Sequence, residues 1–226
     1  WRAETATAGW KIKYYKGLAT SNSKEAKEYF ARMKTLDYIC AEQIDHDAIV
    51  KAFDKGGGKG VSSTSATDKR KTWILDALRA PEDINYATQR VPTVEFVNKE
   101  LVLFSIADVY RSIPNLVDGL KTSQRKVLYA CFKRNLVKEI KVAQLSGYVS
   151  EHSAYHHGEQ SLNMTIVSMA QKFVGHNNIN YLVPSGQFGS RIKGGDDAGS
   201  PRYIFTALEK KTTKIFNPDD NVLLDY

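Results

Sequence analysis

The chain has 226 residues, of which 42% are hydrophobic, and a formal net charge of +7 at pH 7. This composition can bury a core, which excludes a wholly disordered chain. No apolar run approaches the roughly 18–20 residues that span a bilayer, so we expect no membrane partner. The two cysteines, Cys40 and Cys131, lie far apart and outside any CxxC spacing, which excludes a disulfide scaffold and a cysteine-rich zinc site. Because the sequence starts at Trp1 without a methionine, we expect it to be an excerpt of a longer protein.

The positive charge is concentrated in one segment. Residues 119–203 contain eleven lysines and arginines against five acidic residues, an excess of six positive charges. A net charge of +7 spread evenly would be an ordinary soluble surface. A localised basic surface is the pattern that phosphate backbones bind, so nucleic acid is the leading partner.

The first hundred residues predict an α/β piece. Residues 10–18 alternate apolar and basic residues, as a half-exposed strand does. We expect Ser23 to cap a helix over residues 24–33, with Ala26, Phe30 and Met33 on its inner face, and a short strand over residues 36–40. The glycine- and serine-rich residues 54–68 predict a flexible loop. It is not a phosphate-binding loop of the GK[ST] type, because Lys59 is followed by glycine.

A helix over residues 68–80, which ends at Pro81, and a strand over residues 94–98 complete this part. The second domain is expected to begin near residue 101 and to be mainly helical up to residue 173. Thr122 or Ser123 can cap a helix there, with Lys126 and Lys133 on its outward face.

The clearest helix covers residues 157–173. Its apolar stripe consists of Leu162, Ile166, Met169, Ala170 and Phe173, and its opposite face gathers His156, Gln160, Asn163 and Gln171. Residues 181–195 and 201–206 predict short, glycine-rich strands. Two helices followed by a basic hairpin are the order of a winged helix-turn-helix, although an ordinary helical core with a solvated outer face fits the same pattern.

Three groups of residues are candidates for a catalytic or binding site. His152, His156 and His157 lie between Glu151 and Glu159, but they lack the HExxH spacing of a metal site. Phosphate hydrogen bonding and a structural capping role both remain open for them. Asp196 and Asp197 follow two glycines, which favours a solvated turn over a catalytic carboxylate pair.

The third group is the pair Arg202–Tyr203. A phenol titrates near pH 10 and is a poor nucleophile unless cations stabilise its ionised form, which an adjacent arginine can do. From spacing alone, a buried tyrosine that tethers a strand explains Tyr203 equally well.

Several blocks resemble the DNA-cleaving core of eukaryotic-type type IIA DNA topoisomerases. They are KIKYYKGLATSNSKEAKEYF, NKELVLFSIADVYRSIPNLVDGLKTSQRKVLYACFKR, KVAQLSGYVSEHSAYHHGEQSLNMTI, MAQKFVG, GQFGSR and SPRYIFT, all in the family's order, with residues 51–90 the weakest part. The chain departs from the family at Ala19, in a GLAT block that usually reads GLGT, and in GLKTSQRK, where the family has a proline. Neither departure touches Tyr203.

The resemblance implies an α+β fold: residues 1–50 are the tail of a metal-binding TOPRIM domain, residues 51–100 a linker region, and residues 101–226 a winged-helix DNA-binding and cleavage domain. It also implies the site. Tyr203 is the nucleophile that forms a 5′-phosphotyrosyl bond with DNA, Arg202 stabilises the scissile phosphate, and His157 is the active-site histidine. The expected DNA contacts are Lys121, Gln124, Arg125, Lys126, His156, Gln160, Ser161, Gln187 and Arg191.

The family also implies partners and cofactors. We expect an ATP-driven, duplex-passing isomerase that works as a homodimer in the nucleus, although an organellar or viral origin fits too. Mg²⁺ would be held by acidic residues upstream of Trp1 and ATP by a domain absent here, so this fragment alone should not cleave DNA. The alternatives are a winged-helix protein that binds DNA without chemistry and a structural domain that has lost its active site.

Overall fold

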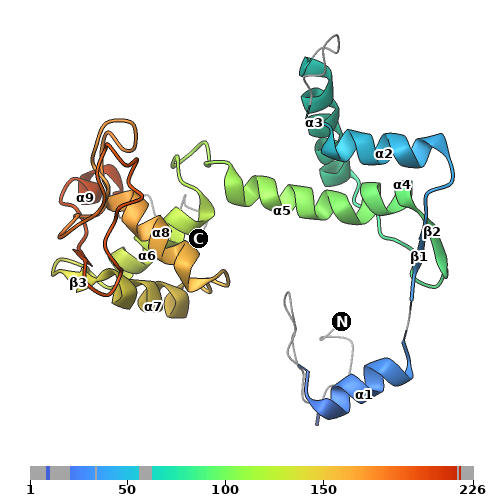
Figure 1. The fold of residues 1–226 in the computed structure, drawn as a ribbon, viewed down its shortest axis with the longest axis horizontal. Coiled ribbons are helices and arrows are strands. Elements are labelled where there is room, and N and C mark those ends of the chain that lie inside the picture. Colours follow the sequence, from blue (N-terminus) through green and yellow to red (C-terminus); the bar gives the residue numbers. More distant parts are fainter. Residues whose placement is uncertain (1–8, 11–20, 34, 56–62, 218, 220–226) are drawn as a thin grey trace. The chain divides into compact units, whose positions relative to one another are not determined.

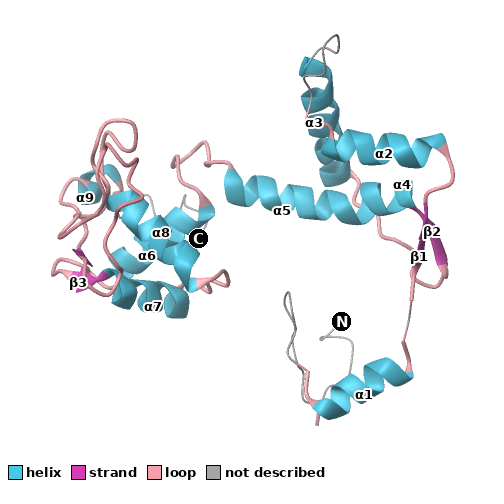
Figure 2. Cartoon of the chain, viewed as in Figure 1, coloured by secondary structure: helices cyan, strands magenta, loops and turns pink. Residues whose placement is uncertain are grey.

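The computed structural model describes residues 9–10, 21–33, 35–55, 63–217 and 219. The chain is α+β and divides into two compact units, one made of residues 1–72 and 80–100, the other of residues 73–79 and 101–226. Figure 1 gives the order of the elements, and Figure 2 shows how small a share of the chain is strand. None of the helices in the described ranges is long and apolar enough to cross a membrane.

In the first unit, helix α1 (Ser23–Ala31) begins with a capping box. The Asn22 side chain accepts the backbone N–H groups of Lys24 and Glu25 at 3.0 and 2.9 Å, and Glu25 accepts the Asn22 N–H. The predicted helix is confirmed, but its cap is Asn22 and not Ser23. Phe30 and Met33 are exposed, Ala26 is half-buried and no residue of α1 is fully buried, so most of the predicted inner face is not packed against the described residues.

Farther along this unit is a two-stranded parallel sheet of β1 (Asp37–Ile39) and β2 (Arg90–Pro92), with Tyr38 opposite Val91. Helix α2 (Gln43–Phe53) packs on α4 (Thr93–Phe96). The buried carboxylate of Asp45 connects them, because it accepts the N–H of Val94 at 2.9 Å. The strand β1 confirms the prediction over residues 36–40, whereas the strand predicted at residues 10–18 lies, from residue 11 on, outside the described residues.

Two predictions in this part are wrong. Residues 94–98 form no strand: α4 runs into a π-helical turn, η1 (Val97–Leu101), and then into α5 (Val102–Ser112). The loop predicted over residues 54–68 is already helical from Ser63, where α3 (Ser63–Arg79) begins. That helix confirms the prediction for residues 68–80 and contributes to both units.

The second unit is built on three helices that pack against one another: α6 (Thr122–Lys133), α7 (Val142–His152) and α8 (Glu159–Ala170) (Figure 1). Strand β3 (Ile140–Lys141) pairs antiparallel with β4 (Phe205–Thr206), and α9 (Thr212–Ile215) follows. The predicted apolar stripe of α8 is confirmed for Leu162, Ile166, Met169 and Ala170. Phe173 lies beyond the end of the helix and is only half-buried.

The core of this unit is aliphatic and continuous. It collects side chains from all three helices and from two segments that precede β4 in the chain: Val127, Leu128, Cys131, Val142, Leu145, Val149, Leu162, Ile166, Leu182 and Ile204. Such a core fixes the helices against one another and leaves their polar ends at the surface. The two stretches predicted as a hairpin, residues 181–195 and 201–206, form no regular ladder with each other among the described residues. They meet at the isolated bridge Ser185–Phe205 and through the hydrogen bond from the Thr206 hydroxyl to the Val183 carbonyl at 2.9 Å.

Candidate nucleophile and nucleic-acid interface

Tyr203 lies on a turn that is fastened to the beginning of α7. Its N–H donates to the carbonyl of Ser200 at 2.8 Å. The carbonyls of Pro201 and Ile204 accept the N–H groups of Ala143 and Val142, each at 3.0 Å. These donors belong to the first turn of α7 and have no partner within the helix. The turn therefore supplies acceptors for the free N–H groups at the start of α7, and the same hydrogen bonds fix the position of the turn.

Burial alternates along this segment. The side chain of Tyr203 is 77% exposed, whereas Ile204 is 3% exposed and Thr206 is fully buried. The hydrophobic core thus anchors the backbone on one side while the phenol faces outward on the other. Arg202, immediately before it, is also exposed. The alternative of a buried, strand-tethering tyrosine is wrong, because Tyr203 buries little of its ring.

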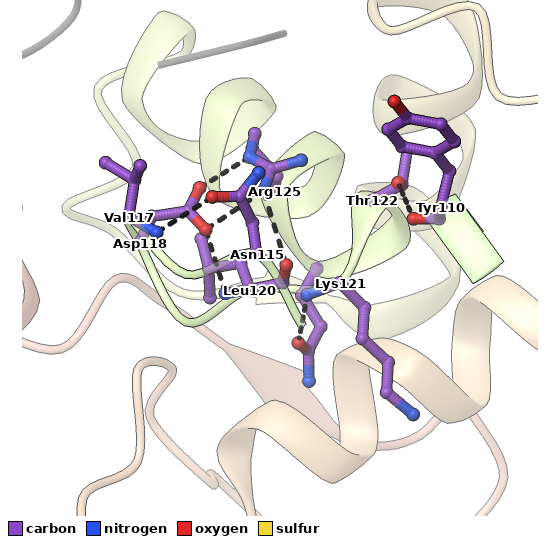
Figure 3. A network of polar contacts seen from close by, with 9 residues as sticks. Tyr110, Asn115, Val117, Asp118, Leu120, Lys121, Thr122 and Arg125 are labelled. Carbon is purple, nitrogen blue, oxygen red and sulfur yellow. Dashed lines mark hydrogen bonds and ion pairs between the residues drawn. The ribbon is translucent and has the colours of Figure 1, made fainter. Parts of the chain in front are cut away.

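Arg125 is part of a buried polar network at the start of α6 (Figure 3). Its guanidinium donates to both carboxylate oxygens of Asp118, from Nε at 2.5 Å and from one Nη at 2.9 Å, and to the carbonyl of Leu120 at 3.3 Å. Asp118 also accepts the Leu120 N–H at 2.9 Å. The side chains of Arg125 and Asp118 are 10% and 4% exposed.

Two opposing effects act on Asp118. Burial raises the pKa of its carboxyl, but the hydrogen bonds from Arg125 and Leu120, together with the arginine's charge, outweigh burial and lower that pKa below its ordinary value. The pair is therefore ionised at neutral pH. Because the guanidinium faces inward, this geometry gives Arg125 a role in shaping the loop before α6, and the direct DNA contact expected from the sequence stays a prediction.

The beginning of α6 meets α8 across a groove. Lys121 is the N-cap residue, with its N–H bound by the Gln124 side chain at 2.9 Å, and Thr122 donates its hydroxyl to the carbonyl of Tyr110 (Figure 3). The cap predicted at Thr122 or Ser123 is therefore wrong by one residue or more. The groove has a volume of about 590 Å³, and its lining includes Lys121, Gln124, Gln160 and Ser161. Four of the expected DNA contacts thus lie together.

A neighbouring hollow of about 350 Å³ contains the two adjacent histidines. Its lining includes Lys126 from α6, Tyr110 from α5, and His156 and His157 from the loop before α8. The ring centroids of His156 and His157 lie 4.2 Å apart. Lys126 donates to the carbonyl of Ala154 at 3.2 Å, which ties α6 to this loop.

His152 is separate from the adjacent histidines. It belongs to α7, stacks on Tyr148 at 4.0 Å between ring centroids, and its Nδ1 lies 3.1 Å from the Tyr148 carbonyl. Within the described ranges, no three histidine, cysteine or acidic side chains come together closely enough to hold a metal ion.

The buried side chain of Gln171 supports the loop that bears Gln187 and Arg191. This side chain is 4% exposed and donates to the carbonyls of Phe188 and Gly195 at 2.8 and 3.1 Å. Gln171 was expected on the outer face of α8, and that prediction is wrong. Its role left no local signal in the sequence, since the contacts span 17 and 24 residues of chain.

The same loop is closed at its other side by Asp197. Its carboxylate accepts the Ser190 N–H at 2.7 Å, and this hydrogen bond lowers the pKa of Asp197. Asp196 and Asp197 are both exposed in a turn, so the predicted turn is confirmed. Gln187 and Arg191 are exposed, so the loop presents both of them to solvent.

The structure places the residues expected at the site in three groups. These are Arg202 with Tyr203, the α6–α8 groove with the histidine hollow beside it, and the loop with Gln187 and Arg191. The expected catalytic residues therefore come from two segments. Arg202 and Tyr203 lie on the turn before β4, whereas His157 lies in the loop before α8.

The A-subunit family of DNA gyrase and topoisomerase IV matches residues 111–226, and the C-terminal associated domain of TOPRIM matches residues 1–109. A probable DNA topoisomerase 2 of Dictyostelium discoideum is 52% identical over 227 residues, which cover 99% of this chain and 14% of the relative. DNA topoisomerase 2-alpha of Homo sapiens is 49% identical over 240 residues, which cover 100% of this chain and 15% of the relative.

A solved structure is similar as well. The crystal structure of the Plasmodium falciparum topoisomerase II DNA-binding, cleavage and re-ligation domain superimposes with a TM-score of 0.74 at 49% identity, covering 100% of this chain and 30% of that one.

These matches define the class of protein, a type IIA DNA topoisomerase, and confirm the resemblance inferred from the sequence blocks. Within that class, the chain belongs to the eukaryotic-type DNA topoisomerase II family, as a segment of its cleavage core. The chain spans only 14–15% of the length of these two relatives, and the limits expected from sequence for the separate domains stay predictions.

Proposed function

We propose that this chain is the segment of a DNA topoisomerase II that binds duplex DNA and cuts it by covalent attack of Tyr203. One observation carries the proposal: the Tyr203 phenol is exposed beside Arg202 on a turn that the core and the first N–H groups of α7 hold in place. A nucleophile needs an accessible oxygen on a firmly held backbone, and Tyr203 has both.

In the proposed reaction, the phenolic oxygen of Tyr203 attacks a DNA phosphorus. A new phosphorus–oxygen bond to tyrosine forms and the bond from phosphorus to the 3′ oxygen breaks. The phenol gives up its proton to solvent or to a neighbouring base, and the departing 3′ oxygen takes up a proton to become a hydroxyl. The reverse attack by that hydroxyl reseals the strand. Because one phosphodiester replaces another, no outside energy source is needed to rejoin the break.

The surrounding residues have supporting roles in this proposal. Arg202 carries a permanent charge that can stabilise both the ionised phenol and the phosphate. The α6–α8 groove, with Lys121 and Gln160, would hold the DNA backbone beside it. His157 would hydrogen-bond the cleaved strand from the histidine hollow. Arg191 would contact phosphates from its loop.

The finer expectations belong to the whole enzyme. Mg²⁺ would supply Lewis-acid stabilisation of the phosphate, but the described residues do not include a cluster suited to it, so no step here passes through the ion. ATP-driven duplex passage and a homodimer are proposed on the relatives' name, and so is a nuclear location. The metal ion, ATP-driven duplex passage, the homodimer and the nuclear location all concern the complete protein, of which this chain is a small part.

The test is Tyr203→Phe in the full-length protein, with supercoiled DNA as the substrate. We expect the variant to form no covalent protein–DNA adducts after denaturant trapping, while the dissociation constant for noncovalent DNA binding changes less than about threefold. Tyr86→Phe is the matched control, because that tyrosine is likewise exposed, donates its hydroxyl to Glu100 in the first unit and has no proposed role in attack or DNA binding. Adducts that persist in Tyr203→Phe would leave a non-catalytic DNA-binding protein as the better account.

A further inference from the structure

The short β3–β4 ladder brings a second cation to the face that bears Tyr203. Lys141 pairs with Phe205 in this antiparallel ladder. Residues directly opposite each other in an antiparallel pair project from the same face. Lys141 and Phe205 both lie on the outer face, where Phe205 is 36% exposed, while Ile204 and Thr206 point into the core.

Tyr203 lies two residues before Phe205, and the alternation of exposed and buried side chains continues through it. It lies in the turn just before the ladder, next to Ile204, whose carbonyl accepts the N–H of Val142, the residue after Lys141. Lys141 and Tyr203 are thus each one residue away from a directly hydrogen-bonded pair, Val142 and Ile204, and a long, exposed lysine side chain can reach across that short separation. A lysine in this position can bring its ammonium to the phenolic oxygen or to a phosphate bound beside it.

The frame that joins these two residues is rigid. The β3–β4 pairing ends at Lys141, and the N–H groups of Val142 and Ala143, in the first turn of α7, then donate to the carbonyls of Ile204 and Pro201. Lys141 is itself the extended N-cap residue of α7, with φ −60° and ψ 139°. No hydrogen bond or ion pair of its ammonium is found with any other described residue, so no internal partner explains its position.

We propose that Lys141 is a second cationic residue at the reacting phosphate, opposite Arg202. This inference rests on the proposed function of Tyr203. A planar guanidinium holds a phosphate in a fixed orientation, whereas an ammonium acts as a mobile point charge. Lys141 would contact a non-bridging phosphate oxygen and stabilise the charge that develops as the tyrosyl ester forms. Its effect should therefore appear in the rate of attack more than in DNA affinity.

The experiment compares three variants of the full-length protein, namely Lys141→Met, Lys141→Arg and Lys138→Met. Lys138 is the control because it is exposed in the same basic segment but lies outside the ladder. The dissociation constant for a duplex oligonucleotide is measured by fluorescence anisotropy. The rate of adduct formation is measured at saturating DNA in a single turnover, and the thermal unfolding midpoint confirms that each variant is folded.

We expect Lys141→Met to slow adduct formation about tenfold or more at saturating DNA, with less than about a threefold change in the dissociation constant. Lys141→Arg should keep the rate within about threefold of wild type, and Lys138→Met should match wild type. A wild-type rate in Lys141→Met, or an equal loss in Lys138→Met, would overturn the inference.

These results separate the two proposals. If Tyr203→Phe abolishes adducts but Lys141→Met does not slow them, Tyr203 remains the nucleophile and only the role of Lys141 is wrong. If Tyr203→Phe forms adducts normally, both proposals are wrong.

Discussion

The side-chain amide of Gln171 donates to the carbonyl of Gly195 at 3.1 Å, across 24 residues of chain. It also donates to the carbonyl of Phe188 at 2.8 Å, so one buried amide group supports both sides of the loop that presents Gln187 and Arg191. Buried carbonyls without such donors would be costly. The position of a candidate DNA-contacting loop therefore depends on one side chain that is itself out of reach of DNA.

Removal of that side chain should loosen the loop. We expect Gln171→Ala to lower the free energy of unfolding by about 1–3 kcal/mol, because two buried carbonyls lose their donor. Limited trypsin digestion should cut more rapidly after Arg191 and Lys193. Gln160→Ala, an exposed change on the preceding helix, should leave both measurements near wild type. Unchanged cleavage in Gln171→Ala would mean that Asp197 and the backbone suffice to hold the loop.

The glycine that faces Gln171 allows a sharper comparison. Gly195 has φ +91°, and a Cβ added there would lie 2.5 Å from Gln171 Nε2. Its neighbour Gly194 has φ +63° with no atom within 4 Å of such a Cβ. Gly194→Ala should cost only the backbone strain of a left-handed residue, about 1–2 kcal/mol. Gly195→Ala should cost clearly more, since it also displaces the amide. Equal losses in urea unfolding would contradict this account of the contact.

The error over Gln171 shows where sequence periodicity stops working. A helical spacing of 100° per residue placed it with Gln160 on the outer face. Helix α8 ends at Ala170, however, and Gln171 is extended, with φ −63° and ψ 133°, so its side chain turns inward. Positions inside the helix, such as Leu162 and Ile166, follow the period and were predicted correctly. Where tertiary contacts decide the end of a helix, the local sequence pattern does not show it.

The wrong strand at residues 94–98 has a similar cause. Val94, Phe96 and Val97 favour a strand by their composition. In the fold, Pro92 precedes the segment with φ −57°, and the Asp45 carboxylate accepts the Val94 N–H from 49 residues away. This long-range contact satisfies a helix N-terminus that local propensity does not favour. Tyr203, by contrast, was picked out together with the adjacent Arg202, a local feature of the sequence, but its role as nucleophile came only from the resemblance of the SPRYIFT block and stays a prediction.

The buried pair of Asp118 and Arg125 predicts a loss of stability in acid. Because the pKa of Asp118 is lowered in the folded state, its contribution is fully present above the ordinary value of 3.8 and is lost as the pH falls through the folded value. We expect Asp118→Ala to cost roughly 3–5 kcal/mol at pH 7, because it removes the carboxylate that faces a buried guanidinium. The difference between wild type and variant should shrink below about pH 4.

Asp108 provides the matched control for this measurement. It pairs with Arg111 on the surface of α5, where the two side chains are 44% and 52% exposed, so Asp108→Ala should change stability by less than about 1 kcal/mol. Urea titrations of both variants between about pH 3 and pH 7 give the comparison, a range that brackets the ordinary carboxyl pKa. A loss for Asp118→Ala that is no larger than that for Asp108→Ala would show that the network in Figure 3 does not stabilise the loop.

A substitution of Lys126 tests noncovalent DNA binding separately from the cleavage reaction. It lines the histidine hollow and also donates to the Ala154 carbonyl, so its ammonium lies where a phosphate could replace or share that contact. We expect Lys126→Ala to weaken binding to duplexes of any sequence and to reduce the slope of log affinity against log salt concentration by about 0.9, the value for one lost phosphate contact. Lys69→Ala, an exposed change in α3, should leave the slope unchanged. An unaltered slope in Lys126→Ala would place this residue away from the duplex and limit its role to anchoring the loop that carries His156 and His157.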